Sequence, residues 1–239
     1  MKMKYLTIDA SHHVIVGVCD VNLGVVQELS AMRSQDSRHH VEQLTPMVRQ
    51  VLQQAGIDRP DAIVVGTGPA AFTGLRAGLV TARTLARAWD MPIYGLSSAE
   101  VMALAGADAG LNLVEGVIDA RRKEVYALQA RAMGADDVEI IKPVRVLKPA
   151  DLAQELSVDR AIVACADGDL YADVLGERVT VDCAPAVMVR LLLSRIARVE
   201  AGEDISFDTE PQYLRRPDVH GGAHSQPAAT ENPYGSAGK

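Results

Sequence analysis

The sequence predicts an α/β protein built from two similar halves, and three observations support this. Short β-branched runs alternate with longer segments whose apolar residues recur at helical spacing. The run Leu6-Thr7-Ile8-Asp9-Ala10 is echoed by Gly116-Val117-Ile118-Asp119-Ala120, and each copy is followed by a polar turn and a second strand. The chain has 239 residues, 48% of them hydrophobic, which is enough for one large or two small domains. Internal duplication is therefore expected.

The first half has the pattern β-β-β-α-β-α-β. Strands are expected at residues 5–10, 14–19 and 25–29, joined by short polar connections into a three-stranded meander. A helix is expected at 39–55, where the apolar residues form one stripe and Gly56 provides a stop. A strand at 62–65, a helix ending at Trp89 before Met91-Pro92, and a strand at 92–96 complete this half.

The second half begins with the repeated strand at 116–120. Strands or extended segments are expected at 125–130, 138–141, 144–147 and 160–164, with helices at 149–156 and 185–200. These patterns suggest an N-terminal subdomain of residues 1–104 and a C-terminal subdomain of residues 105–217. Residues 218–239 carry few apolar anchors and are expected to form a disordered tail.

The segment 66–78, GTGPAAFTGLRAG, lies where an apolar strand becomes a helix, with Thr73 as the expected N-cap. Unpaired N–H groups at a helix start attract phosphate, which makes Asp9, Gly68, Thr73 and Gly74 the candidates for cofactor contact. The alternative is that the glycines only allow a tight turn. The segment lacks both the Gly-Lys-Ser/Thr of a P-loop and a full G-x-G-x-x-G.

Composition excludes several classes of function. A net charge of −7 argues against a broad electrostatic grip on nucleic acid. Cys19, Cys165 and Cys183 are far apart in apolar surroundings, as expected of buried free thiols in a reducing compartment. No apolar stretch approaches membrane length, so a cytoplasmic location without a membrane partner is expected.

Four segments carry a resemblance to a known family. They are Ile8-Asp9-Ala10-Ser11, the stretch His40-Val41-Glu42-Gln43-Leu44-Thr45-Pro46, residues 68–78, and Glu210-Pro211-Gln212-Tyr213-Leu214-Arg215. With the meander and the repeated Ile-Asp strand, they resemble the actin-like, sugar-kinase and Hsp70 superfamily, and more narrowly the TsaB (YeaZ) family. The resemblance implies a duplicated actin-like (ribonuclease H-like) fold, with two subdomains of mixed five-stranded sheets flanked by helices.

The same resemblance implies a function. TsaB proteins are partner proteins in the synthesis of N6-threonylcarbamoyladenosine at position 37 of tRNA. The expected partners are a TsaD-like catalytic paralogue, which uses threonylcarbamoyl adenylate, and a TsaE-like ATPase. Because the chain is acidic, we expect tRNA to be reached only through the complex, and the outer helix faces expected to bind the partner could form a homodimer when that partner is absent. No cofactor is assigned to this chain, and ATP or ADP is expected only in the complex.

Catalytic groups are not evident in the sequence. Catalytic relatives hold a metal with two helical histidines four residues apart, but the matching region 95–103 contains no histidine. Ala10, Ala70 and Ala71 stand where the family usually has Thr, Gly and Ser, which weakens a direct nucleotide role. We therefore expect no catalytic residue and no metal site. The alternative is an ATP-dependent phosphotransferase or a glycoprotease-like metallopeptidase of the same fold.

Two kinds of side chain leave an alternative open. Asp9 and Asp119 end equivalent strands, where such carboxylates either hold a metal–water shell or bond to their own turns. The adjacent pairs His12-His13 and His39-His40 are poorly spaced for chelation, because neighbouring side chains diverge on strands and helices alike.

A partner surface is expected on the outer faces of the helices at 39–55 and 75–89. Uncharged residues recur on the first and small residues on the second, and such faces favour close helix packing over solvation. The alternative is an ordinary polar face. The expected interface residues are Gln43, Met47, Gln50, Gln54, Arg76, Ala77, Val80, Thr81, Thr84 and Ala88, with Arg76, Arg83 and Arg87 as a charged rim.

Overall fold

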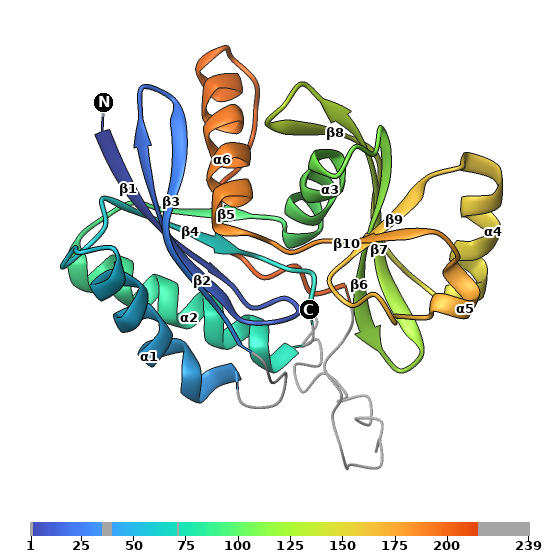
Figure 1. Ribbon diagram of the computed structural model, residues 1–239, viewed down its shortest axis with the longest axis horizontal. Helices are drawn as coiled ribbons and strands as arrows, with labels where there is room; N and C mark the ends of the chain where they lie inside the picture. The colour runs from blue at the N-terminus through green and yellow to red at the C-terminus, as the bar shows by residue number, and fades with distance from the viewer. Residues whose placement is uncertain (1, 35–39, 71, 215–239) are drawn as a thin grey trace, which may run out of the picture.

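The structure is a computed structural model that describes residues 2–34, 40–70 and 72–214, and these form two five-stranded sheets with helices on both sides (Figure 1). The first half contains β1 (Lys2–Asp9), β2 (Ile15–Asn22), β3 (Val25–Arg33), α1 (His40–Gln54), β4 (Ala62–Gly66), α2 (Phe72–Trp89), β5 (Ile93–Leu96) and α3 (Ser98–Asp108). The second contains β6 (Leu113–Arg121), β7 (Glu124–Met133), β8 (Asp137–Leu147), α4 (Pro149–Asp159), β9 (Ile162–Cys165), α5 (Ala172–Leu175), β10 (Arg178–Thr180) and α6 (Pro185–Glu200).

The two sheets share one topology. The first has the strand order β3-β2-β1-β4-β5 and the second, read from its far edge, has β8-β7-β6-β9-β10. In each sheet the first three strands form an antiparallel meander. The fourth strand then pairs in parallel with the first, and the fifth pairs in parallel with the fourth. This confirms the predicted internal duplication and the mixed five-stranded, actin-like architecture.

The elements stack in layers around three apolar clusters (Figure 1). Helices α1 and α2 cover one face of the first sheet, where they bury Leu6 and Ile8 of β1. Helices α3 and α6 lie between the two sheets in the largest cluster, which joins Tyr5 of β1 to Leu128 of β7. Helices α4 and α5 cover the outer face of the second sheet.

Four elements differ from the sequence prediction: α3 at the junction of the two halves, and β8, α5 and β10 in the second half. Helix α3 was not predicted, because it is apolar on all sides and therefore lacks the amphipathic stripe of a surface helix. Strand β8 is continuous through Pro143, which joins two predicted segments, since an edge strand can spare the missing N–H group. The short elements α5 and β10 were also not predicted.

The end of the described chain returns to the first sheet. Helix α6 packs against strands β1 to β5, although the sequence assigns it to the C-terminal subdomain. Residues 205–214, which we call the strap, then run beside β5: the N–H group of Gly95 donates to the carbonyl of Phe207 at 2.9 Å. The proposed boundary at 104/105 falls inside α3. The predicted tail, 218–239, lies outside the described residues.

Candidate functional site

Asp9 lies at the end of β1, and both oxygens of its carboxylate accept hydrogen bonds from protein donors. One carboxylate oxygen accepts hydrogen bonds from the N–H of Ser11 at 2.9 Å and from its hydroxyl at 2.5 Å. The other accepts from the hydroxyl of Ser98, at the start of α3, at 2.6 Å. Burial raises the pKa of Asp9, and these hydrogen bonds oppose that rise. The side chain, only 1% exposed, therefore links β1 to α3.

The loop after β4 is closed against the same residues. A Cβ atom at Gly66 would lie 1.9 Å from an Asp9 carboxylate oxygen, so only glycine fits there. The N–H of Gly68 donates to the Ser98 hydroxyl at 3.3 Å, and the carbonyl of Gly68 accepts from the N–H of Ser98 at 2.8 Å. Residues 66–70 are all buried. The expectation of free backbone donors in this loop is therefore wrong for Gly68.

Helix α2 begins at Phe72, which corrects the predicted cap. Thr73 and Gly74 lie inside the first turn of the helix, where Thr73 is exposed. A cap precedes the first helical residue, so Thr73 cannot be the N-cap of this helix. Gly68 has a φ of +93°, a conformation that favours glycine and accounts for this residue without a ligand.

Asp119 closes its own turn in the second half. Its carboxylate accepts a hydrogen bond from the N–H of Arg121 at 2.7 Å and forms an ion pair with the Arg121 guanidinium at 3.1 Å. The bond to the residue two positions later repeats the one between Asp9 and Ser11. Both aspartates therefore bond to their own turns, as one of the two interpretations left open by the sequence expects.

Across the described residues, no group of three or more His, Cys, Asp or Glu side chains is arranged to hold a metal ion. The rings of His12 and His13 meet edge to face, with centroids 4.2 Å apart; His39 lies outside the described residues. The three cysteines are free and buried as predicted, and burial raises the pKa of Cys19 to about 12.

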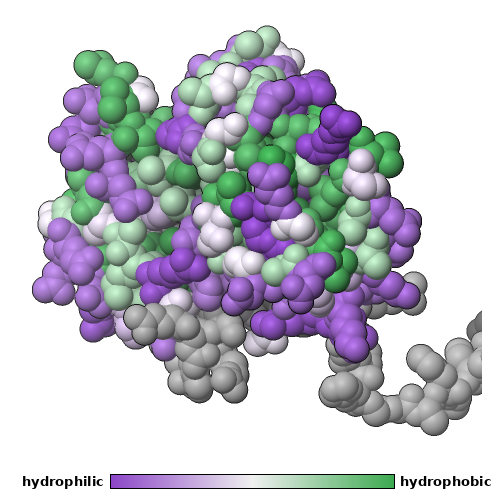
Figure 2. All heavy atoms as spheres, turned by 45° about the vertical axis from the view of Figure 1, so that its right-hand side comes forward, coloured by the Kyte–Doolittle hydropathy of each residue, from purple (hydrophilic) through white to green (hydrophobic). Residues whose placement is uncertain are grey.

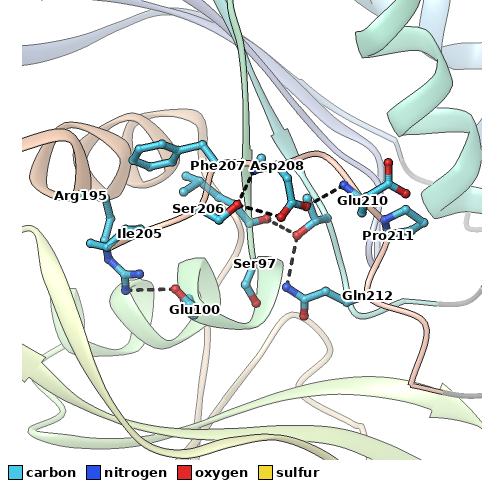
Figure 3. Close-up of a pocket in the computed structure, with 13 residues that line it drawn as sticks. Ser97, Glu100, Arg195, Ile205, Ser206, Phe207, Asp208, Glu210, Pro211 and Gln212 are labelled. Carbon is cyan, nitrogen blue, oxygen red and sulfur yellow. Dashed lines mark hydrogen bonds and ion pairs between the residues drawn. The ribbon is translucent and has the colours of Figure 1, made fainter. Parts of the chain in front are cut away.

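A polar pocket of about 370 Å³ lies between the β5–α3 junction, α6 and the strap (Figure 3). At one side Arg195 pairs with Glu100 at 3.0 Å, and at the other the amide nitrogen of Gln212 donates to the hydroxyl of Thr67 at 3.3 Å. Burial raises the pKa of Glu100, while Arg195 lowers it. The polar groups of the walls thus bond mainly to one another and hold the strap in place.

The strap also fastens onto α2. Arg83 donates to the hydroxyl and the carbonyl of Thr209, at 2.8 and 2.6 Å, and pairs with Glu210 at 2.8 Å. Arg76 donates to the hydroxyl of Tyr213 at 2.6 Å and lies 5.4 Å from its ring centroid. Tyr213 of the closing Pro-x-Tyr-Leu-Arg motif therefore bonds to α2, and two arginines of the expected rim are engaged within the chain.

The predicted partner residues divide by exposure. On α2, Ala77 and Thr81 are half-buried, and the exposed members are Arg76, Val80, Thr84 and Ala88. On α1, Gln43, Gln50 and Gln54 are exposed.

Met47 corrects this set. It is 5% exposed and belongs to the core cluster under α1 and α2. It lies three residues after Leu44 and four before Val51, on the apolar stripe itself, so its place on the outer face was wrong.

Figure 2 brings the second subdomain forward and shows hydrophobic residues interspersed with hydrophilic ones. The exposed large apolar residues of that half include Ile140, Ile141, Val158 and Val174. Among the helices of the described ranges, none combines the length and the apolar character needed to cross a membrane.

Comparisons with known proteins agree with this architecture. An uncharacterized protein of Mycobacterium tuberculosis is 46% identical over 93 residues, which are 38% of this chain and 42% of that protein, so the chain spans less than half of that relative. The tRNA threonylcarbamoyladenosine biosynthesis protein TsaB of Haemophilus influenzae is 29% identical over 212 residues, 82% of this chain and 89% of that protein. The structure of YeaZ from Pseudomonas aeruginosa superposes with a TM-score of 0.71 at 26% identity, covering 89% of this chain and 100% of that one.

A family model described as TsaD: tRNA N6-adenosine threonylcarbamoyltransferase matches residues 30–171, which is more than half of the chain. This range runs from the end of β3 to the residue before α5 and so contains the Gly66 loop, α2, α3 and strands β6 to β9 of the second sheet. The chain therefore belongs to the TsaD family, and TsaB and YeaZ proteins are among its homologues.

Proposed function

We propose that this chain is a non-catalytic scaffold and activating subunit in the formation of N6-threonylcarbamoyladenosine at position 37 of tRNA, and that it binds and stabilises a catalytic TsaD paralogue. Its homology to proteins named for tRNA threonylcarbamoyladenosine biosynthesis supports the role in this modification. The likeness to TsaB extends over 82% of the chain, which supports the assignment to a TsaB-type role within the family.

The observation that carries the non-catalytic assignment is the closed loop at Asp9. A carboxylate that holds a metal–water shell needs free lone pairs facing a ligand. Both oxygens of Asp9 already accept hydrogen bonds from Ser11 and Ser98, and the N–H of Gly68 donates to the Ser98 hydroxyl. A phosphate could bind here only after these hydrogen bonds are broken, which costs more free energy than binding to a preformed site.

The proposed docking surface combines the outer faces of α1 and α2. Val80 is 61% exposed on α2, and Thr84 and Ala88 continue the same face with small side chains. Small residues let a partner helix approach closely, and Gln43, Gln50 and Gln54 of α1 provide hydrogen-bonding groups without charge. The partner is a protein of the same fold: the TsaD paralogue in the complex, and a second copy of this chain in isolation.

The remaining parts of the proposal follow from this role. A TsaE-like ATPase is the third component, and any ATP or ADP binds only in the complex. The complex acts in the cytoplasm, where the free thiols of Cys19, Cys165 and Cys183 stay reduced.

The test is co-expression of this chain with the TsaD paralogue of the same cell, followed by affinity purification of one component. We expect the two to elute together and the complex, completed with the ATPase, to modify tRNA. The isolated chain is assayed in parallel for ATP turnover, peptide hydrolysis and bound metal. Robust activity of the isolated chain would overturn the scaffold role in favour of a phosphotransferase or metallopeptidase, and failure to co-purify would overturn the partnership.

A further inference from the structure

The turn between β6 and β7 has an unusual backbone for its residues. Arg121, Arg122 and Lys123 have φ values of 62°, 54° and 61°, a left-handed region that side-chain-bearing residues rarely adopt. Arg121 lies opposite Glu124 in the antiparallel register of β6 and β7, so Arg122 and Lys123 are the two central residues of the turn. Two-residue hairpin turns with positive φ at both positions normally contain Asn or Gly.

Other hairpins of this chain place glycine in at least one left-handed position. The β2–β3 turn has the two central residues Leu23 and Gly24, with φ values of 53° and 82°. The β7–β8 turn has Gly134 at 68°. Only the β6–β7 turn places consecutive charged residues in this conformation among the described residues. Conformation alone favours Gly or Asn at such positions, so it does not explain the presence of Arg122 and Lys123.

The charge of this turn stands out in an acidic chain. Residues 121–123 are the single run of three consecutive cations in a sequence with a net charge of −7. All three side chains are exposed, and that of Arg121, which also pairs with Asp119, is 62% exposed.

Neighbouring groups belong to the β1–β2 turn and to the ends of other strands. His12 lies within electrostatic range of Arg33 and Arg121, and also of Asp119 and Asp167. Arg33 pairs with Asp182. Arg33 and Arg121 thus pair with carboxylates around His12, and Arg122 and Lys123 are the two central residues of the adjoining hairpin turn.

We propose that the hairpin tip formed by Arg121, Arg122 and Lys123 contacts the phosphate backbone of RNA. Arginine offers a planar fork of donors that matches a phosphate, and lysine adds a point charge. A small, local contact is the kind that an acidic protein can make, because its remaining surface repels the polyanion. This inference rests on the proposed function, in which the RNA is the tRNA bound by the complex.

The experiment uses the complex of the full chain with its TsaD paralogue, whose assembly is first checked by gel filtration. Binding of a fluorescently labelled, unmodified tRNA transcript is measured at several salt concentrations for wild type and for R122Q/K123Q. The matched control is K2Q/R59Q, which removes two positive charges from the first sheet, at the start of β1 and in the loop before β4. The variant K123G removes one charge and relieves the left-handed backbone.

We expect R122Q/K123Q to weaken tRNA binding about tenfold and to reduce the slope of log K against log salt by about 1 to 2, while the control changes neither. K123G should weaken tRNA binding without lowering the melting temperature. An unchanged slope in R122Q/K123Q, or an equal loss in the control, overturns the proposal. If R122Q/K123Q weakens ATP binding but not tRNA binding, the proposal is also overturned, because the turn would then belong to a site for a free nucleotide.

Failure of this inference is distinct from failure of the proposed function. If the complex assembles and the double variant binds tRNA normally, only the RNA contact is wrong. If no complex forms, the partnership is wrong, and the same titration on the isolated full chain decides whether the hairpin tip contacts RNA.

Discussion

Asp9 shows at the scale of one residue how a carboxylate at a strand end joins elements that are distant in the sequence. The end of β1 faces the loop after β4 and the start of α3, where three donors converge on one carboxylate. Because all of these bonds are buried, each lost donor leaves an unsatisfied group and destabilises the fold. The same geometry makes two neighbouring positions sensitive to substitution, Gly66 and Asp9 itself.

Substitution of Gly66 by alanine is expected to destabilise the protein by about 1 to 3 kcal/mol. The added Cβ would lie 1.9 Å from an Asp9 oxygen and 2.7 Å from the Ser98 hydroxyl, so the carboxylate must move. Urea denaturation measures the change.

The matched control is Gly78→Ala on α2. Its Cβ meets Ala10 at 3.1 Å, and the gain in helix propensity offsets that close contact. A Gly66→Ala variant as stable as Gly78→Ala would contradict the close packing at Asp9.

Asp9→Asn is expected to change how stability depends on pH. Burial raises the pKa of Asp9 in the folded state above the ordinary value of 3.8, so the folded chain holds a proton that the unfolded chain releases. Wild type therefore loses stability as the pH rises from 3.8 through the raised pKa. Asparagine does not titrate and lacks this loss.

The cost of Asp9→Asn, about 1 to 2 kcal/mol from mismatched hydrogen bonds, should therefore be largest at the acid end of this window and shrink above it. Urea titrations of both proteins across the window measure the difference. A cost that grows with pH would mean that the pKa of Asp9 is lowered by folding.

At the scale of elements, the strap and α2 form one unit, because Arg76 and Arg83 lie seven residues apart on the same side of the helix. Arg83→Ala removes three bonds to Thr209 and Glu210. The Arg83 side chain is 41% exposed and that of Glu210 77%, so global stability should change by less than about 1.5 kcal/mol.

Local opening of the strap is the more sensitive readout of Arg83→Ala. The backbone N–H of Gln212 donates to the backbone carbonyl of Thr67, and its hydrogen exchange should become about fivefold faster in this variant. Arg87→Ala, one turn farther along α2, is the control and should leave this amide unchanged. Equal protection in both variants would show that Arg83 does not fasten the strap.

The docking surface on α2 predicts the effect of Val80→Glu. A charge placed at the centre of a helix contact is desolvated on binding, so affinity for the TsaD paralogue should fall at least about 30-fold. Because Val80 is 61% exposed, the melting temperature should stay nearly unchanged.

Val158→Glu on α4 provides the control for Val80→Glu, since this valine is 79% exposed on the other half of the molecule. Isothermal titration calorimetry compares the two variants. Equal affinity in both would place the interface elsewhere.

Prediction of the elements succeeded where the pattern is local and failed where burial is two-sided. Helices α1, α2 and α6 show an apolar stripe and begin or end at recognisable residues such as Pro185. Helix α3 has no polar side because sheets and helices cover it all round, so its sequence contains no amphipathic signal. Met47 shows the same limit at one position, since a methionine suits both a core and an interface.

At the scale of the whole molecule, the two sheets share one core through α3 and α6. Met188 and Leu192 of α6 lie in the same buried cluster as Tyr5 and Val64 of the first sheet. We therefore expect fragments 1–108 and 109–214 to be only partly folded when expressed separately, because each exposes an apolar face that the other covers.

Mixing the two fragments should restore the near-ultraviolet circular dichroism of the intact chain. Each fragment alone should lack a cooperative thermal transition. A cooperative transition in fragment 1–108 alone would show that the first subdomain is independent of α6.

The sequence by itself determined most of the strand pattern and the duplication, because these features depend on residues close together along the chain. Only the tertiary structure decided that the Gly66 loop is closed and that Arg76 and Arg83 hold the strap. Ser98 lies 89 residues from Asp9, and Tyr213 lies 137 residues from Arg76. Such contacts arise from the packing of distant elements, and no local periodicity encodes which donor will meet which acceptor.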